Sequence, residues 1–296
     1  MAATLDWYGC ATFRLTVGSL VVFLDAYIDR APGAPGTGLT ADDVDRADWI
    51  LVGHSHFDHL WGAERIARNT GATIVGSYES IRVMAEQGVP EAQLVPVAGG
   101  EPVRLSDDVI VTVFPSQHSC VWTKAGGMFQ ADTVCIGDLG VTHQERLAAF
   151  AAMRDLMAGL SPGAVDHLRV SNQHPRGDGG ALVFLIDTPE GSLLYQDTSG
   201  HWTGILQDLR PDVAILAAAG RGNVDGEPVQ GTLAGFVARQ AALVKANKVV
   251  LSHHDDWLPG FSSAIDVGLV REQVARQAPR TSLVELDYLD GHKIFT

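Results

Sequence analysis

The sequence predicts an α/β protein, because short apolar strands alternate with helical segments and clusters of polar residues follow several of the strands. The chain has 296 residues, with 46% hydrophobic and 19% charged content, which is typical of globular rather than disordered proteins. This length is enough for a sizeable core, and no repeat or linker divides it. We therefore expect a single ordered domain over residues 1–296.

The first half of the chain supplies most of the predicted alternation. Residues 12–17 alternate between apolar and polar side chains, and residues 20–24 and 49–53 are apolar runs, so each favours a strand. Glycine and proline in residues 31–40 favour a loop. A helical spacing follows residue 60 and ends at Gly71. Further elements are expected as strands at 73–75, 94–97, 103–105 and 109–114, with a helix at 78–87.

The second half repeats the alternation after a long irregular stretch. Residues 142–160 have helical spacing, whereas residues 161–180 show no clear period. Because residues 119–180 contain no regular strand and are long for a connection, we expect an insertion that forms a cap or lid. Beyond it, a helix is expected from the N-cap candidate Thr232, and strands at 181–187, 192–196, 213–216 and 248–251.

Histidines and aspartates gather where the predicted strands end. The cluster His54-Ser55-His56-Phe57-Asp58-His59 follows Gly53, and His118, Asp197 and His253 each follow a later strand. Ligands of α/β sheets bind at such strand ends. Imidazole and carboxylate are good ligands for zinc and similar dications. The pattern therefore predicts a metal site, in which residues 54 and 56 address one ion and residues 58 and 59 a second.

The order H-x-H-x-D-H, followed by separate His, Asp and His at strand ends, resembles the metallo-β-lactamase superfamily. Two further stretches, residues 7–12 (WYGCAT) and 253–257 (HHDDW), resemble its L-ascorbate-6-phosphate lactonase-like branch. The resemblance runs from residue 5 to about 262, except for the insertion. It implies a four-layer αββα sandwich with one or two Zn²⁺ ions, Mn²⁺ being the other candidate.

The resemblance also implies a set of ligands: His54, His56 and His118 for the first ion, Asp58, His59 and His253 for the second, and Asp197 as the bridge. Asp25 matches the carboxylate that orients a ligating histidine in the family. Asp197 lacks the glycine that usually precedes it, and the ascorbate lactonases lack an obvious counterpart of His118, so their substrate is not transferred. His253 is preferred to His254 because it ends the strand directly, which leaves His254 as a substrate contact.

This site predicts a hydrolase that opens a lactone or carboxylic ester by a metal-activated hydroxide. Asp58 would orient the nucleophile as well as ligate, and His201 or His254 would protonate the leaving alkoxide. The alternatives are a phosphodiesterase acting on a small molecule, a non-hydrolytic di-iron redox protein, and a metal-binding protein without activity.

Aromatic and basic residues bear on the substrate. Four tryptophans follow proposed ligands closely, which predicts an aromatic wall suited to an apolar or ring-shaped small molecule; they are Trp61, Trp122, Trp202 and Trp257. A phosphate-bearing substrate would need arginines instead, for which the loop candidates are Arg169, Arg176 and Arg221.

Charge and cysteine content restrict the partners. With 21 basic and 35 acidic residues the net charge is −14, which disfavours nucleic acid. The three cysteines, Cys10, Cys120 and Cys135, are widely spaced, which favours buried thiols in a reducing compartment and argues against a thiolate zinc site. No signal peptide and no apolar run of membrane-spanning length is evident, so we expect a cytoplasmic protein that does not bind membranes.

Overall fold

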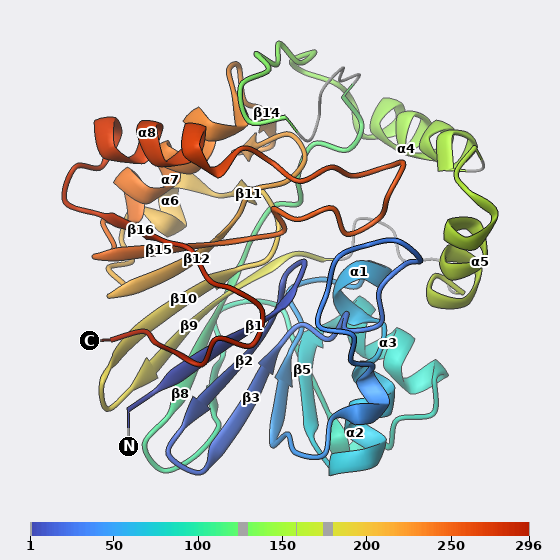
Figure 1. Cartoon of the computed structure of the whole chain (residues 1–296), viewed down its shortest axis with the longest axis vertical. Coiled ribbons are helices and arrows are strands. Elements are labelled where there is room, and N and C mark those ends of the chain that lie inside the picture. Colours follow the sequence, from blue (N-terminus) through green and yellow to red (C-terminus); the bar gives the residue numbers. More distant parts are fainter. Residues whose placement is uncertain (1, 124–129, 158, 174–179, 296) are drawn as a thin grey trace.

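The computed structural model describes residues 2–123, 130–157, 159–173 and 180–295, and it contains two sheets flanked by helices (Figure 1). The first sheet has seven strands in the order β17-β1-β2-β3-β4-β5-β6. Its strands are β1 (Thr4–Gly9), β2 (Thr12–Val17), β3 (Leu20–Leu24), β4 (Trp49–Leu51), β5 (Thr73–Ser77), β6 (Leu94–Val97) and β17 (His292–Lys293).

The second sheet also has seven strands, in the order β16-β15-β12-β10-β9-β8-β7. They are β7 (Pro102–Arg104), β8 (Ile110–Pro115), β9 (Leu182–Thr188), β10 (Gly191–Gln196), β12 (Val213–Ala217), β15 (Lys248–Ser252) and β16 (Ser282–Val284). A small sheet joins β11 (Gly200–His201), β13 (Asn223–Val224) and β14 (Glu227–Pro228).

Helices cover the outer face of each sheet (Figure 1). The first sheet packs against α2 (Ala63–Thr70) and α3 (Tyr78–Glu86), and the second against α6 (Thr203–Leu206), α7 (Leu233–Val244) and α8 (Val267–Gln277). The remaining helical elements are α1 (Phe57–Leu60), α4 (His143–Met157) and α5 (Pro162–Ser171), with the short turns η1 (Ala41–Asp43) and η2 (Glu91–Gln93).

The alternation of side chains along each strand builds the layers. In β3, Val22 and Leu24 pack toward the second sheet, while Phe23 between them belongs to the cluster beneath α2 and α3. In β12, Ile215 faces the first sheet and Leu216 contacts the α7 and α8 layer. Successive side chains of a strand point to opposite faces, so each apolar run stabilises two interfaces. The result is the predicted αββα sandwich.

Parallel pairing brings the polar clusters to one end of the sheets. Strands β3 to β6 pair in parallel, as do β10, β12, β15 and β16. The segments that follow β3, β4, β10 and β15 therefore leave the sheets at their carboxyl ends, where α/β proteins place ligands.

The apolar spacing of the sequence does not predict the helix α5. Residues 161–180 were expected to be irregular, but α5 occupies Pro162–Ser171, with Pro162 in its first turn and the Ser161 hydroxyl accepting a hydrogen bond from the Ala164 N–H. The Ser-Pro start is a good helix signal that outweighs the weak apolar period. Residues 124–129, 158 and 174–179 of the expected cap lie outside the described part of the chain.

Among the described helices, none is both long and apolar enough to cross a membrane.

Candidate metal centre

The histidine cluster is divided between an extended segment and a single helical turn. His56 has extended backbone angles and is the N-cap of α1, whose Leu60 N–H donates to the His56 carbonyl at 3.0 Å. His54 and His56 therefore project from extended chain, while Asp58 and His59 project from the first turn of the helix. The backbone changes direction between the two pairs, but the side chains stay close together, because the ring centroids of His54 and His59 lie 4.0 Å apart.

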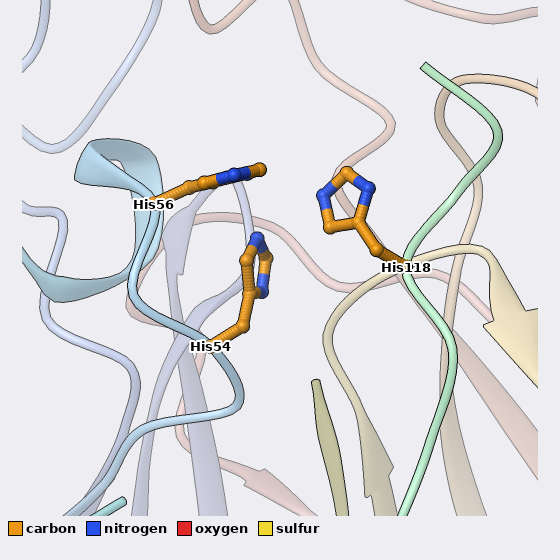
Figure 2. Close-up of side chains that lie close together, drawn as sticks. All are labelled: His54, His56 and His118. Atoms are coloured by element: carbon orange, nitrogen blue, oxygen red, sulfur yellow. The ribbon is translucent and has the colours of Figure 1, made fainter. Parts of the chain in front are cut away.

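The structure brings His118 next to His54 and His56, as Figure 2 shows. One ligand atom from each of the three residues lies within 4.8 Å of the other two. The His118 Nδ1–H donates to the Ser119 carbonyl at 2.9 Å, which leaves the lone pair on Nε2. His54 is fully buried, and its Nε2 has no hydrogen-bond partner among the described residues. We call this set the three-histidine group.

A second set of ligand atoms surrounds His253. Its Nε2 lies 3.1 Å from Asp58 Oδ2 and 3.2 Å from His59 Nε2. The His59 Nδ1–H donates to Asp25 Oδ2 at 2.6 Å, so the His59 lone pair faces His253. The Tyr195 hydroxyl donates to the same Asp25 oxygen at 2.6 Å. The contact predicted between Asp25 and a histidine of the cluster is therefore present.

Asp197 lies between the two sets. Its Oδ2 is 2.5 Å from His54 Nδ1 and 3.3 Å from His59 Nδ1, and its Oδ1 is buried without a partner among the described residues. Gly53 makes this approach possible, because a β-carbon at that position would overlap the Asp197 carboxylate. The Asp197 carboxylate therefore contacts one histidine of each set, and its bridging role stays a prediction.

Burial and mutual charge shift the pKa values of these side chains. Burial, reinforced by the neighbouring histidines, holds the pKa values of His54 and His118 well below their usual range. Burial alone would raise the pKa of Asp58, but His59 and His253 outweigh it and hold that pKa well below normal. Burial raises the pKa of Asp197 to about 6. His54 and His118 are therefore uncharged imidazoles with free lone pairs, which is the form that ligates a cation. Burial alone would lower the pKa of His59, but Asp58 and Asp25 outweigh it and raise that pKa well above normal, so a cation bound there would displace a proton.

The backbone around the centre is held in unusual conformations. Cys10, Asp25 and His253 have φ values of 50°, 56° and 61°, in the left-handed region that residues other than glycine rarely adopt. The His253 N–H donates to the Cys10 carbonyl at 2.8 Å, which joins two of these residues directly. Such conformations persist only where the surroundings enforce them, and they concentrate at functional sites.

The residues present fit a bound dication. Imidazole nitrogens and carboxylate oxygens are the donors that zinc prefers, and manganese also accepts them. Buried polar atoms normally have a partner, so the unpartnered His54 Nε2 and Asp197 Oδ1 indicate that a further polar group or ion belongs at this centre. All seven predicted ligands lie in this region, namely His54, His56, Asp58, His59, His118, Asp197 and His253.

The structure does not bring His201 and His254 into these groups. His201 is buried, stacks on Phe236 and meets the Gln240 side-chain amide at 3.1 Å. His254 stacks on Trp7 with ring centroids 4.5 Å apart. Burial lowers the pKa of each to about 4, so both are uncharged near neutral pH. Their role as proton donors to the leaving alkoxide therefore stays a prediction.

The predicted aromatic wall forms only in part. Trp257 lies edge-on to His253 with centroids 5.0 Å apart, whereas Trp202 is exposed. Trp61 and Trp122 stack instead with Arg65 and Arg146. The ring of Phe150 in α4, which the sequence did not single out for the site, stacks on His56 at 6.1 Å. The sequence gives no signal of this contact, because the apolar face of a helix explains a phenylalanine at this position equally well.

The arginines and cysteines singled out in the sequence lie in different surroundings. Arg169 is exposed and pairs with Asp166, Arg221 is buried, and Arg176 lies outside the described residues. The cysteines are free and buried, as expected. Cys10, however, lies in a group with Asp58 and His253 whose ligand atoms are all within 4.8 Å. The stretch WYGCAT contained this residue, but only its role as an apolar side chain was predicted.

Loss of the ionisable group at His201 is expected to make the protein less sensitive to acid. The folded pKa of about 4 lies below the ordinary value of about 6.5, so the unfolded chain binds the proton more readily. The contribution of His201 to the free energy of unfolding is therefore fully present above about pH 6.5. It is lost as the pH drops toward 4, by up to about 3 kcal/mol. Urea unfolding of His201→Gln across this range should show a shallower decline than wild type. If the free energy of unfolding declines as steeply with falling pH in His201→Gln as in the exposed control His143→Gln, the lowered pKa assigned to His201 is wrong.

Comparisons with known proteins agree with this architecture. A family model described as a beta-lactamase superfamily domain matches residues 21–164. A metal-dependent hydrolase of Pyrobaculum islandicum is 39% identical over 169 residues, which cover 53% of this chain and 70% of the relative. A relative from Pyrobaculum arsenaticum is 38% identical over 147 residues, which cover 46% of this chain and 64% of the relative, slightly less than two thirds of its length.

Solved structures share the fold across almost the whole chain. Igni18, described as a metallo hydrolase from Ignicoccus hospitalis, has a TM-score of 0.61 at 16% identity and covers 97% of this chain, with 96% of its own chain matched. An isothiocyanate hydrolase from Delia radicum gut bacteria has a TM-score of 0.58 at 14% identity, with 98% and 97% covered. The fold, the histidine cluster and the curated relatives lead to one conclusion: this chain belongs to the UPF0173 metal-dependent hydrolase family of the metallo-β-lactamase superfamily.

Proposed function

We propose that this protein is a metal-dependent hydrolase that opens a lactone or carboxylic ester at the centre described above. One observation carries the proposal: the ligand atoms of His54, His56 and His118 lie within 4.8 Å of one another, beside a second set at His253. Two adjacent sets of this kind suit one or two Zn²⁺ ions, or Mn²⁺. Membership of a family of metal-dependent hydrolases supports the same reading.

The three-histidine group would hold the first ion, and Asp58, His59 and His253 the second, with Asp197 between them. When bound, such ions acidify a water molecule and polarise a carbonyl oxygen. The Asp58 carboxylate stays ionised beside His59 and His253, so it can accept a hydrogen bond and orient the attacking water. Asp25 fixes the ring of His59.

The surroundings favour an apolar or cyclic substrate. Phe150 stacks on His56 in the three-histidine group, and Trp257 lies edge-on to His253 in the second set of ligands. Aromatic walls with a few polar groups are typical of small-molecule sites. Residues 119–180 supply Phe150, and also the His167 ring that meets the Tyr27 hydroxyl at 2.8 Å. We therefore propose that 119–180 covers the centre as a cap on a single domain.

A turnover screen of the zinc- and manganese-loaded protein tests the proposed function. We expect hydrolysis of lactones or carboxylic esters, and loss of that activity after a chelator removes the metal. Phosphodiesters and non-hydrolytic oxidation belong in the same screen. Hydrolysis of phosphodiesters alone, or an iron-dependent oxidation without hydrolysis, would replace the proposal with one of these activities.

Removal of the Phe150 ring is expected to weaken substrate binding while leaving the metal in place. Aromatic contacts contribute about 0.5–1.5 kcal/mol, so Phe150→Ala should raise KM about 2- to 10-fold for an apolar ester. Leu147→Ala, at an exposed position of the same helix, is the matched control and should leave KM unchanged. Equal effects of the two substitutions would show that Phe150 matters only for the helix. Metal content of both variants should equal that of wild type.

A further inference from the structure

We propose that Cys10 ligates the second ion through Sγ, together with Asp58 and His253, so that this half of the centre is a thiolate site. This inference rests on the proposed metal centre and adds a ligand that comes from the start of the first sheet. Cys10 lies in the turn between β1 and β2 and is fully buried. Its Sγ belongs to the set of ligand atoms within 4.8 Å that includes Asp58 and His253.

The spacing of the atoms matches that of ligands on one tetrahedral ion. Zinc holds nitrogen at about 2.0–2.1 Å and sulfur at about 2.3 Å, which sets a nitrogen and a sulfur about 3.5–3.6 Å apart. The Cys10 Sγ lies 3.6 Å from His253 Nε2. Two nitrogens on such an ion are about 3.3–3.4 Å apart, and His59 Nε2 lies 3.2 Å from His253 Nε2. The thiol thus joins Asp58 and His253 in a set of three ligand atoms, and His59 lies beside His253 at the edge of that set.

The backbone of Cys10 is fixed toward His253 by several hydrogen bonds. Its carbonyl accepts from the His253 N–H at 2.8 Å and from the Trp7 indole at 3.1 Å, and its N–H donates to Asp255 Oδ1 at 3.1 Å. Asp255 is itself paired with Arg30. The loop after β15 therefore holds the thiol-bearing turn and the ligating histidine as one unit. These bonds orient the backbone, and the thiol itself lies 3.6 Å from the Asp58 carbonyl oxygen as well as from His253 Nε2.

Ligation by Cys10 has a definite chemical consequence. A sulfur–metal bond forms as the thiol proton leaves to solvent, so the sulfur binds as a thiolate with no change of oxidation state. Thiolate is a soft ligand that favours zinc and cobalt, whereas manganese prefers carboxylate and water. We therefore expect the site with the Cys10 thiolate to select zinc over manganese. Nitrogen and oxygen ligands alone would select zinc less strongly.

Cobalt substitution tests the assignment without reference to activity. Cobalt bound by a thiolate gives an intense sulfur-to-metal charge-transfer band in the near ultraviolet, which nitrogen and oxygen ligands do not give. We expect the band in wild type and in the control Cys120→Ser, which alters another buried thiol. Cys10→Ser and Cys10→Ala should lose the band while retaining cobalt at the three-histidine group. Competition between zinc and manganese should shift toward manganese by about tenfold or more in Cys10→Ser.

The outcomes separate this inference from the proposed function. Stoichiometric cobalt in wild type without the band, or a band that persists in Cys10→Ser, overturns the thiolate ligand and leaves the histidine centre intact. Failure of wild type to bind any cobalt overturns both. Because the decisive spectrum is that of the wild-type protein, misfolding of a Cys10 variant would not prevent the test, and Cys10→Ala provides a second substitution.

Discussion

His56→Ala is expected to lose both bound metal and turnover. His56 contributes one of the ligand atoms of the three-histidine group, and the other two belong to His54 and His118. Removal of an outer hydrogen-bond partner of a ligand alone typically costs about 10- to 100-fold in affinity, so removal of a ligand should cost more than about 100-fold. Metal analysis after dialysis and kcat/KM for the best substrate are the measurements.

A histidine outside the centre provides the comparison for this variant. His143→Ala replaces an exposed histidine at the start of α4 and should retain wild-type metal and activity. Thermal unfolding of both variants without metal shows whether the fold is unchanged. A correctly folded His56→Ala with wild-type metal content would contradict the assignment of the three-histidine group.

Gly53→Ala is expected to damage the centre although the residue has no side chain to ligate. The added β-carbon would overlap the Asp197 carboxylate, and the Gly53 N–H also donates to Asp25 Oδ1 at 2.8 Å. Overpacking of this kind costs about 1–3 kcal/mol of stability, and displacement of Asp197 should lower metal affinity at least about tenfold. Isothermal titration with zinc measures the second effect.

The matched control for this substitution is Gly204→Ala. A β-carbon at Gly204 would meet nothing within 4 Å, and the residue lies in α6, so the change should leave metal affinity and stability close to wild type. Equal zinc affinity of Gly53→Ala and Gly204→Ala would show that the close approach of Asp197 does not matter for binding.

The fold and much of the centre could be predicted because their signals are local. The apolar runs at β3, β4, β12 and β15 are short, dense and bounded by polar clusters, so their lengths and ends are evident from the sequence. The spacing of His54, His56, Asp58 and His59 also lies within one turn of chain. Asp25 was found by resemblance, and its contact with His59 follows from the parallel pairing of β3 with β4.

The parts that could not be predicted depend on contacts between distant segments. Cys10 lies 243 residues from His253 in the chain, and nothing near Cys10 indicates that the two meet. His201 resembles a site residue in sequence, but the helix α7 brings Phe236 and Gln240 against it. The helix α8 was missed, and only two of its residues, Val270 and Val274, are fully buried. Such outcomes are decided by tertiary packing rather than by local pattern.

Anomalous diffraction from crystals of the zinc-loaded protein tests the central claim most directly. We expect one peak among the imidazoles of His54, His56 and His118, and at full loading a second among Asp58, His59 and His253. Peaks confined to other parts of the molecule, or density that shows His118 or His253 turned away from the ion, would contradict the proposed centre and the hydrolytic function built on it.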